Sequence, residues 1–125
     1  MFQHISIGVK DIERSREFYD KALSPLGYER LVSVTGRAGY GAESPKMWLF
    51  ETPSPVPRDP KSGLHFCFDA PSKQAVDAFH AAGIATGGED NGPPGVRPEY
   101  ATFYYAAFLI DPDGYRIEAF FHLPE

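Results

Sequence analysis

Hydrophobic and polar residues alternate at the start of the chain, and the pattern then changes to a helical period. A strand is expected over residues 2–9, because its apolar residues recur at every second position and would share one face. Those apolar residues are Ile5, Ile7 and Val9. Asp11 is a good N-cap for a helix over residues 12–23, whose apolar side chains recur at helical spacing. The chain therefore opens with a half-buried strand and an amphipathic helix.

Short apolar segments separated by turn residues continue the first half of the chain. Three strands are expected, over residues 28–34, 38–42 and 46–50. The next segment, residues 52–63, carries four prolines. Proline lacks the backbone N–H that a central strand needs, so this segment is interpreted as a linker between two halves.

The second half repeats the order of a strand followed by a capped helix. A strand over residues 64–69 leads to Ser72, which is expected to cap a helix over residues 73–82 that Gly83 ends. The remaining expected elements are a short strand near 84–87, a glycine- and proline-rich loop over 87–100, and two aromatic strands over 102–110 and 115–123 joined by a type I turn at 111–114.

A histidine stands near the start of the leading strand in each half. His4 and His65 are 61 residues apart, and the same offset relates Asp11 to Ser72, Phe18 to Phe79 and Gly27 to Gly88. The repeat predicts an α+β fold in which two βαβββ modules form one cupped mixed sheet with helices on its outer face. The expected organisation is a single domain of residues 1–125, with module one at about 1–51, a linker at 52–63 and module two at about 64–123.

Strand parity places His4, His65 and Glu118 opposite the aliphatic residues of their own strands. A carboxylate in the middle of an apolar strand costs several kcal/mol unless it is paired, and Arg116 on the same face or a divalent metal would pair with Glu118. Two imidazoles and one carboxylate suit Fe, Mn, Zn or Ni and leave coordination positions open. In the alternative interpretation, the histidines are ordinary strand residues and Glu118 forms an ion pair with Arg116 in a wet cavity. His122, on the same face as Glu118, is a further candidate ligand.

Aromatic and basic residues are the candidates for substrate binding. The aromatic residues would form walls of a small apolar pocket with phenolic donors, or else pack as strand and core residues; they are Trp48, Tyr100, Tyr104 and Tyr105. Arg97 and Tyr100 lie in the long loop, where they would close over a ligand and hold an anionic group, or else remain solvated. Arg116 completes this substrate-binding set.

Composition limits the classes of partner. The net charge of −5 over 125 residues provides no basic patch, so nucleic acid is not an expected partner. No apolar run approaches the roughly 20 residues that a membrane helix needs, and no secretory signal is recognised at the N-terminus. The one cysteine, Cys67, excludes an intrachain disulfide and suits a reducing cytoplasm, where the protein is expected.

Three segments resemble the vicinal oxygen chelate superfamily, which includes glyoxalase I, bleomycin resistance proteins and extradiol dioxygenases. They are HISIGVKDIERSREFYDKALSPLGY, GLHFCFDAPSKQAVDAF and YYAAFLIDPDGYRIEAF. The resemblance implies the two-module fold, a homodimer, and a divalent metal held by His4, His65 and Glu118. The fourth ligand of glyoxalase I would fall on Leu49, which cannot ligate, although Glu51 lies two residues further on the same strand face.

Two functional hypotheses follow. In the first, the protein is a metal-dependent dioxygenase, or a lyase or isomerase, that acts on a small oxygen-chelating substrate, with Glu118 or Glu51 as the base. In the second, the same cup is a non-catalytic binding site for a drug or metabolite, of the bleomycin resistance type. Exposed strand edges agree with the homodimer that the resemblance implies.

Overall fold

The computed structural model describes all 125 residues and contains the same βαβββ arrangement twice. Module one consists of β1 (Ile5–Val9), α1 (Ile12–Leu23), a 3-10 turn η1 (Ser24–Leu26), β2 (Glu29–Val34), β3 (Arg37–Gly41) and β4 (Met47–Glu51). Module two consists of β5 (His65–Asp69), α2 (Lys73–Ala85), β6 (Glu89–Val96), β7 (Tyr104–Ile110) and β8 (Arg116–His122). These elements confirm the α+β fold that the repeat predicted.

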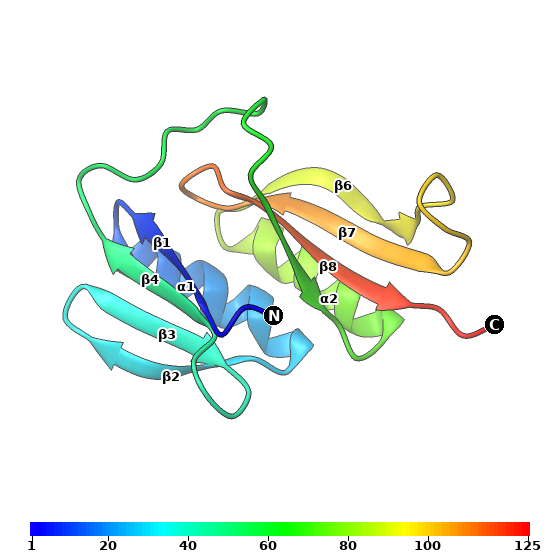
Figure 1. Cartoon of the computed structure of the whole chain (residues 1–125), viewed down its shortest axis with the longest axis horizontal. Helices are drawn as coiled ribbons and strands as arrows, with labels where there is room; N and C mark the ends of the chain where they lie inside the picture. Colours follow the sequence, from blue (N-terminus) through cyan, green and yellow to red (C-terminus); the bar gives the residue numbers. More distant parts are fainter.

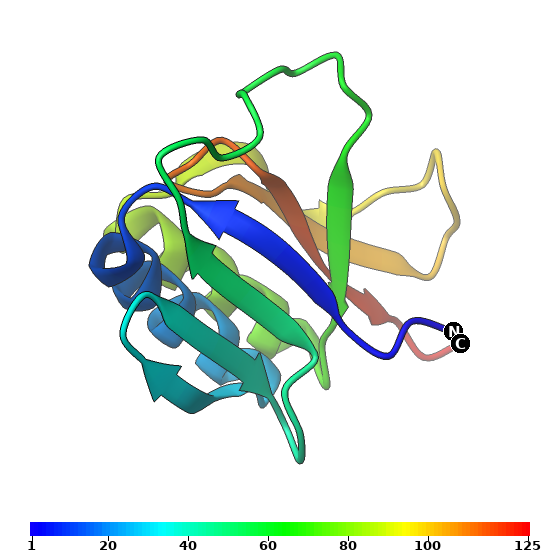
Figure 2. The same cartoon turned by 60° about the vertical axis from the view of Figure 1, so that its left-hand side comes forward.

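The eight strands are divided into two four-stranded sheets, with orders β1-β4-β3-β2 and β5-β8-β7-β6. In each sheet the first strand of the module runs parallel to the last, and the other neighbours are antiparallel. β1 and β5 are therefore edge strands, and they lie next to each other at the middle of the molecule (Figures 1 and 2). Each of them has one edge without a strand partner.

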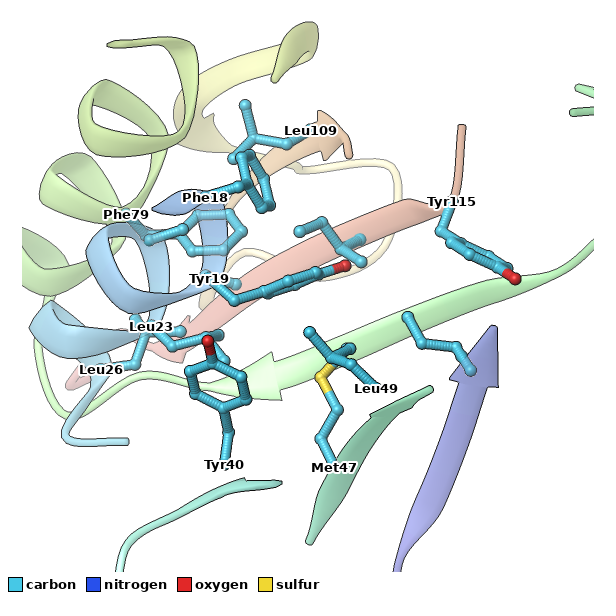
Figure 3. Packing of buried hydrophobic residues seen from close by; sticks show 14 of the residues in the cluster. Phe18, Tyr19, Leu23, Leu26, Tyr40, Met47, Leu49, Phe79, Leu109 and Tyr115 are labelled. Carbon is cyan, nitrogen blue, oxygen red and sulfur yellow. The ribbon is translucent and has the colours of Figure 1, made fainter. Parts of the chain in front are cut away.

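Both helices lie on the same side of the two sheets, behind the strands in Figure 1. The hydrophobic core of 21 residues fills the space between the helices and the strands of both modules. Figure 3 shows Phe18 and Tyr19 of α1 among side chains from both modules, including Phe79, Leu109 and Leu49. The other side of the sheets carries no helix, and it is called the open face below.

Local signals in the sequence account for the helix starts. The Asp11 side chain accepts hydrogen bonds from the backbone N–H groups of Glu13 and Arg14, at 3.1 and 3.2 Å. The Ser72 side chain accepts one from the N–H of Ala75 at 3.0 Å. These bonds satisfy donors that have no partner inside the helix, which is why α1 and α2 begin where the caps predicted.

The end of α2 differs from the prediction. The helix continues through Gly83 to Ala85, so the expected strand near 84–87 does not form. Gly83 is buried, and a Cβ added to it would lie 2.3 Å from Leu109 Cδ1 and 3.3 Å from Phe18 Cε1. This glycine permits close packing of α2 against β7 and is not a helix terminator.

The segment predicted to be a loop after α2 contains β6. This strand pairs only with β7, and its register shifts between Asp90 and Gly92 and again between Gly92 and Gly95. Proline is tolerated at a sheet edge and at bulges, since it removes no hydrogen bond that a second neighbour needs. The prediction of a loop was wrong because Pro93 and Pro94 lie on an edge strand, between the shifted pairs.

Neither α-helix is long and apolar enough to cross a membrane.

Candidate functional site

A group of three hydrogen-bonded side chains lies on the open face of module two. His65 Nε2 donates to Glu118 Oε1 at 2.7 Å, and the Tyr104 hydroxyl donates to Glu118 Oε2 at 2.5 Å. The carboxylate therefore has a partner on each oxygen. Its side chain is only 5% exposed, whereas that of His65 is 36% exposed, so the imidazole is the accessible part of the group.

Strand pairing brings these residues together. In the parallel β5–β8 ladder Cys67 lies opposite Glu118, and in the antiparallel β7–β8 ladder Phe108 lies opposite Glu118 from the other side. Tyr104 is four residues from Phe108 along β7, and the small residue Ala106 lies between them on the same face. The long side chain of Tyr104 can therefore extend past the small Ala106 and reach the Glu118 carboxylate.

Burial and hydrogen bonding act on Glu118 in opposite directions. Burial raises the pKa of a carboxyl group, but the hydrogen bonds from His65 and Tyr104 outweigh it and hold the pKa of Glu118 below its ordinary value. The same environment raises the pKa of Tyr104, through burial first and through the neighbouring carboxylate second. Glu118 is therefore an anion at neutral pH and Tyr104 is a neutral donor.

Cys67 lies beside this group but is not prepared for nucleophilic chemistry. Loss of water around its sulfur, followed by the charge of Glu118, raises the pKa of the thiol to about 12. A thiol with such a pKa is protonated at neutral pH, and the thiolate is the reactive form. Cys67 is therefore a small residue at the edge of the site.

Tyr105, expected on the wall of the pocket, faces the other way. Its hydroxyl donates to Asp77 on α2 at 2.5 Å, and the residue is buried in the core. Adjacent residues of a strand point to opposite faces, so only one of Tyr104 and Tyr105 can lie on the open face. The structure places Tyr104 there, and Tyr105 has the core role that was the alternative.

Arg116 does not pair with Glu118 as expected. Its guanidinium donates to the carbonyl oxygens of Pro60 at 2.5 Å and Leu64 at 3.2 Å, and to the Ser62 hydroxyl at 3.5 Å. These contacts hold the end of the linker against β8. The expected ion pair with Glu118 is replaced by the contacts of the carboxylate with a histidine and a tyrosine, and Arg116 is a structural contact of the linker in this chain.

Arg97 and Tyr100 lie around the group in module two. The Arg97 guanidinium lies 5.2 Å from the centre of the Phe108 ring, and the Tyr100 ring lies edge-on to Tyr104 at 5.0 Å. Tyr100 is 63% exposed. Both residues therefore contact neighbours of Glu118 and keep a surface for a ligand.

His4 and His122 are not part of the group. His4 is exposed just before β1, where its Nδ1 contacts the Gln3 side chain. The His122 ring stacks on Phe103 at 3.9 Å, and its Nδ1 contacts the backbone oxygen of Leu123. No group of three or more His, Cys, Asp and Glu side chains within one chain is arranged to hold a metal ion.

The two donors that do converge match part of a metal site. Ligand atoms about 2.0–2.2 Å from an ion and at right angles to each other are roughly 3 Å apart. The 2.7 Å between His65 Nε2 and Glu118 Oε1 is close to that separation, and both atoms are of types that bind divalent ions. Tyr104 fixes the other carboxylate oxygen, as outer partners of metal ligands do. One chain therefore supplies a two-donor half-site.

The position in module one that corresponds to Glu118 is Trp48, and the alignment with Leu49 was wrong by one residue. The offset of the repeat relates Ser6 to Cys67. Ser6 pairs with Trp48 in the β1–β4 ladder, just as Cys67 pairs with Glu118 in the β5–β8 ladder. Leu49 is fully buried in the core, so its side chain points toward the helices.

Glu51 and Leu49 lie on the same face of β4, the face that points toward the core, so Glu51 does not line the open face. Its Oε2 accepts a hydrogen bond from the backbone N–H of Ile12 at 3.0 Å, at the first turn of α1. A carboxylate is favourable at a helix N-terminus. Glu51 therefore stabilises α1, and it neither ligates a metal on the open face nor serves as a base there.

A cavity of about 790 Å³ lies at the junction of the two modules. It opens between the start of β1 and the end of β5, and its lining includes Phe2, Tyr28, Lys46 and Cys67. Cys67 is also the ladder neighbour of Glu118. Cys67 therefore links the cavity to the half-site, although none of His65, Tyr104 and Glu118 lines the cavity itself.

The sequence identified two of the three residues in the hydrogen-bonded group on the open face, His65 and Glu118. Tyr104 was considered only as one of several aromatic wall residues, because the hairpin register was needed to choose between Tyr104 and Tyr105. In the observed register Ile110 lies opposite Arg116 and Phe108 opposite Glu118, so five residues, 111–115, separate the paired strands, one more than the predicted four-residue turn. A count back from the predicted turn at 111–114 would have paired Ala107 with Glu118 and placed Tyr105 on its face, so no signal in the sequence selects Tyr104.

Comparisons with known proteins agree with this architecture. A sequence model of the Glyoxalase/Bleomycin resistance protein/Dioxygenase superfamily matches residues 1–119. Among solved structures, a glyoxalase/bleomycin resistance protein from Albidiferax ferrireducens T118 has 37% sequence identity and a TM-score of 0.84, and the match covers 96% of this chain and 98% of that chain.

More distant structures share the fold. A glyoxalase/dioxygenase from Nostoc punctiforme has 24% identity and a TM-score of 0.72, over 100% of this chain and 92% of that chain. The fosfomycin resistance protein FosX from Listeria monocytogenes has 19% identity and a TM-score of 0.69, over 96% of this chain and 91% of that chain. At these identities the likeness concerns the fold alone. A comparison with curated proteins gave no match.

Proposed function

The chain belongs to the glyoxalase/bleomycin resistance protein/dioxygenase superfamily, and we propose that it is a metal-dependent enzyme for a small substrate that chelates the metal through oxygens. The observation that carries the proposal is the 2.7 Å approach of His65 Nε2 to Glu118 Oε1 on the open face. A buried carboxylate held next to an accessible imidazole is the core of a two-histidine, one-glutamate site. The expected third ligand is His4.

A homodimer would bring His4 to this half-site. Within one chain His4 joins no metal-binding group, and it lies exposed at the start of an edge strand. Two copies related by a two-fold axis can place module one of each copy against module two of the other. Each site then takes His65 and Glu118 from one copy and His4 from the second copy. The unpaired edges of β1 and β5 and the helix-free open face support such an assembly.

The residues of this chain then have separate roles. The bound ion would supply Lewis-acid chemistry, or dioxygen chemistry if it is iron. Glu118 is the ligand and the expected proton acceptor, because its lowered pKa keeps it ionised at neutral pH. Tyr104 holds the carboxylate in place. Arg97 and Tyr100 surround the aromatic neighbours of Glu118, where they would hold an anionic or aromatic part of the substrate.

A second candidate function is binding of a small molecule without turnover. The observation that favours it is that both oxygens of Glu118 already have protein donors. A carboxylate satisfied in this way needs no metal to be stable. In that case the open face would bind its ligand through the aromatic residues around Tyr104, and metal would have no effect on binding.

Metal uptake separates the two functions. Protein without a histidine tag is loaded with Fe(II), Mn(II), Zn(II) or Ni(II), and bound metal is measured by mass spectrometry. We expect His65→Ala and Glu118→Gln to lose metal, and His122→Ala to retain it as the matched histidine control. Less than a tenth of an equivalent of every metal in the unmodified protein would contradict the enzyme proposal.

Mixed dimers test the contribution of His4 from a second copy. His4→Ala and His65→Ala proteins each lack a ligand in both sites of their own dimer. In a mixed dimer, one site combines intact His4 with intact His65, so mixing after unfolding and refolding should restore part of the metal uptake. If each site were formed within one chain, mixing would restore none. Light scattering before mixing establishes whether each variant is a dimer.

We also propose that the protein is located in the cytoplasm. A cytoplasmic location agrees with the single free cysteine, Cys67.

A further inference from the structure

Module one presents an aromatic residue at the position where module two presents Glu118. Across the first sheet, Trp48 lies between Ser6 on β1 and Gly39 on β3. Across the second sheet, Glu118 lies between Cys67 and Phe108. The two rows occupy matching places in the repeat, so the modules offer different chemistry on the same face.

The neighbours of Trp48 make room for its indole. A Cβ added to Gly39 would lie 2.9 Å from Trp48 Cζ3 and 3.1 Å from Pro45 Cβ. The six-membered ring of Trp48 therefore lies over Gly39 and beside Pro45. Ser6 on the other side is also small, and Val32 continues the row beyond Gly39. This row contains no carboxylate and no histidine, and Trp48 is only partly buried.

The next row along the same face is aromatic as well. Phe50 lies between Gly8 and Arg37 in the ladder, and the Arg37 guanidinium lies 4.6 Å from the centre of the Phe50 ring. The cation of Arg37 is therefore already engaged by a ring. Together, Trp48 and Phe50 form an apolar aromatic surface on module one, in contrast to the polar group of His65, Glu118 and Tyr104 on module two.

We propose that Trp48 is a specificity-determining residue, and that the substrate carries a planar aromatic group that stacks on the Trp48 indole. This rests on the proposed function, since it assumes that module one of one copy faces module two of another. The oxygens of the substrate would then lie at the His65–Glu118 half-site and its ring on the Trp48 surface. Indole has the largest ring face of the amino acid side chains, and it stacks on planar groups.

The single tryptophan of the chain makes this contact directly observable. Mandelate and hexahydromandelate carry the same α-hydroxycarboxylate and differ only in an aromatic or a saturated ring. We expect mandelate to bind at least about threefold more tightly in calorimetric titrations and to change the fluorescence of Trp48. Equal affinities, an absence of mandelate binding, or binding without a change in fluorescence would overturn the proposal.

Variants of Trp48 and Gly39 test whether the preference for mandelate over hexahydromandelate comes from the Trp48 ring. Trp48→Phe keeps a planar group and should keep part of the preference for mandelate, whereas Trp48→Leu should lose it. Gly39→Ala keeps the tryptophan but displaces its ring, so it should change both the fluorescence and the preference. Phe103→Leu, an aromatic change at the His122 stack, is the control that should leave both unchanged. Circular dichroism checks that each variant is folded.

Failure of this inference can be told apart from failure of the proposed function. Metal uptake is measured in the same samples, and both ligands are also titrated into metal-free protein and into His65→Ala. A preference for mandelate that survives without metal would support the Trp48 surface even if no metal site exists. Normal metal uptake with equal affinities for the two ligands would overturn the role of Trp48 and leave the metal site intact.

Discussion

Tyr19 on α1 donates a hydrogen bond to Asp111 Oδ2 at 2.5 Å, and this bond joins a helix of module one to the β7–β8 turn of module two. Both residues are buried. The other oxygen of Asp111 accepts hydrogen bonds from the backbone N–H groups of Asp113 and Tyr115, each at 2.9 Å. One carboxyl group therefore shapes the turn and also connects the modules.

Removal of the Tyr19 hydroxyl should destabilise the fold. In Tyr19→Phe the buried Asp111 loses a hydrogen-bond donor, so we expect the free energy of unfolding to fall by about 1–3 kcal/mol. Urea denaturation measures the change. Tyr40→Phe is the matched control, because its hydroxyl bonds the half-buried Asp20 at 2.7 Å. An equal or larger loss in Tyr40→Phe would contradict the special role of the Tyr19–Asp111 bond.

The same carboxyl group should make stability depend on pH. Burial is the main cause that raises the pKa of Asp111 to about 6, from 3.8 in the unfolded chain. The folded state therefore binds the proton more tightly, and the contribution of Asp111 to stability is fully present below pH 3.8 and lost as the pH rises through about 6. The loss is on the order of 3 kcal/mol, since the pKa rises from 3.8 to about 6 and each pKa unit corresponds to about 1.4 kcal/mol.

Asp111→Asn tests this dependence because asparagine keeps an acceptor and does not ionise. We expect the difference in unfolding free energy between Asp111→Asn and the unmodified protein to shift in favour of the variant between pH 4 and pH 7.5. Denaturation curves at several pH values measure it. Parallel pH profiles for the two proteins would show that the pKa of Asp111 is not raised in the folded state.

Close packing at Gly83 gives a third prediction. The Cβ of Gly83→Ala would overlap Leu109, so we expect a loss of about 1–3 kcal/mol despite the better helix propensity of alanine. Thermal unfolding measures it. The double variant Gly83→Ala/Leu109→Val should recover part of the loss if overlap is the cause. Recovery would be absent if the glycine were needed for its backbone conformation.

The sequence predicted the elements whose signals are local. Asp11 and a regular apolar stripe were sufficient to place α1 at its observed bounds, because the cap bonds lie within three residues. The end of α2 and the strand β6 were missed for a different reason. Gly83 is explained by Leu109 on another strand, and Pro93 is tolerated because β6 is at a sheet edge. Neither fact can be read from neighbouring residues.

The prediction of the site residues was limited in the same way, by contacts between distant segments. Strand parity identified His65 and Glu118 because parity is a property of one strand. The choice of Tyr104 over Tyr105, and of Trp48 over Leu49, depends on the register between strands. A shift of one residue moves a side chain to the opposite face, so an alignment of the two halves that was wrong by one position gave the wrong residue.

The pair of adjacent tyrosines provides the sharpest test of the half-site. Tyr104→Phe removes the donor to Glu118 Oε2 and leaves His65 in place. Loss of an outer partner of a metal ligand weakens metal binding by about 10- to 100-fold, and we expect a decrease of that size in titrations with Zn(II) or Mn(II). The pKa of Glu118 should rise as well, because one of the hydrogen bonds that lower it is gone.

Tyr105→Phe is the matched control, since it removes the same hydroxyl one residue away on the opposite face of β7. Its hydroxyl bonds Asp77 on α2, so we expect a small change in stability and no change in metal affinity. The pH at which bound metal is released adds a second measurement. In Tyr104→Phe release should begin at a higher pH than in the unmodified protein or in Tyr105→Phe, because Glu118 is protonated more easily. Equal metal affinities and release profiles for the two variants would mean that Tyr104 does not support a metal ligand at Glu118.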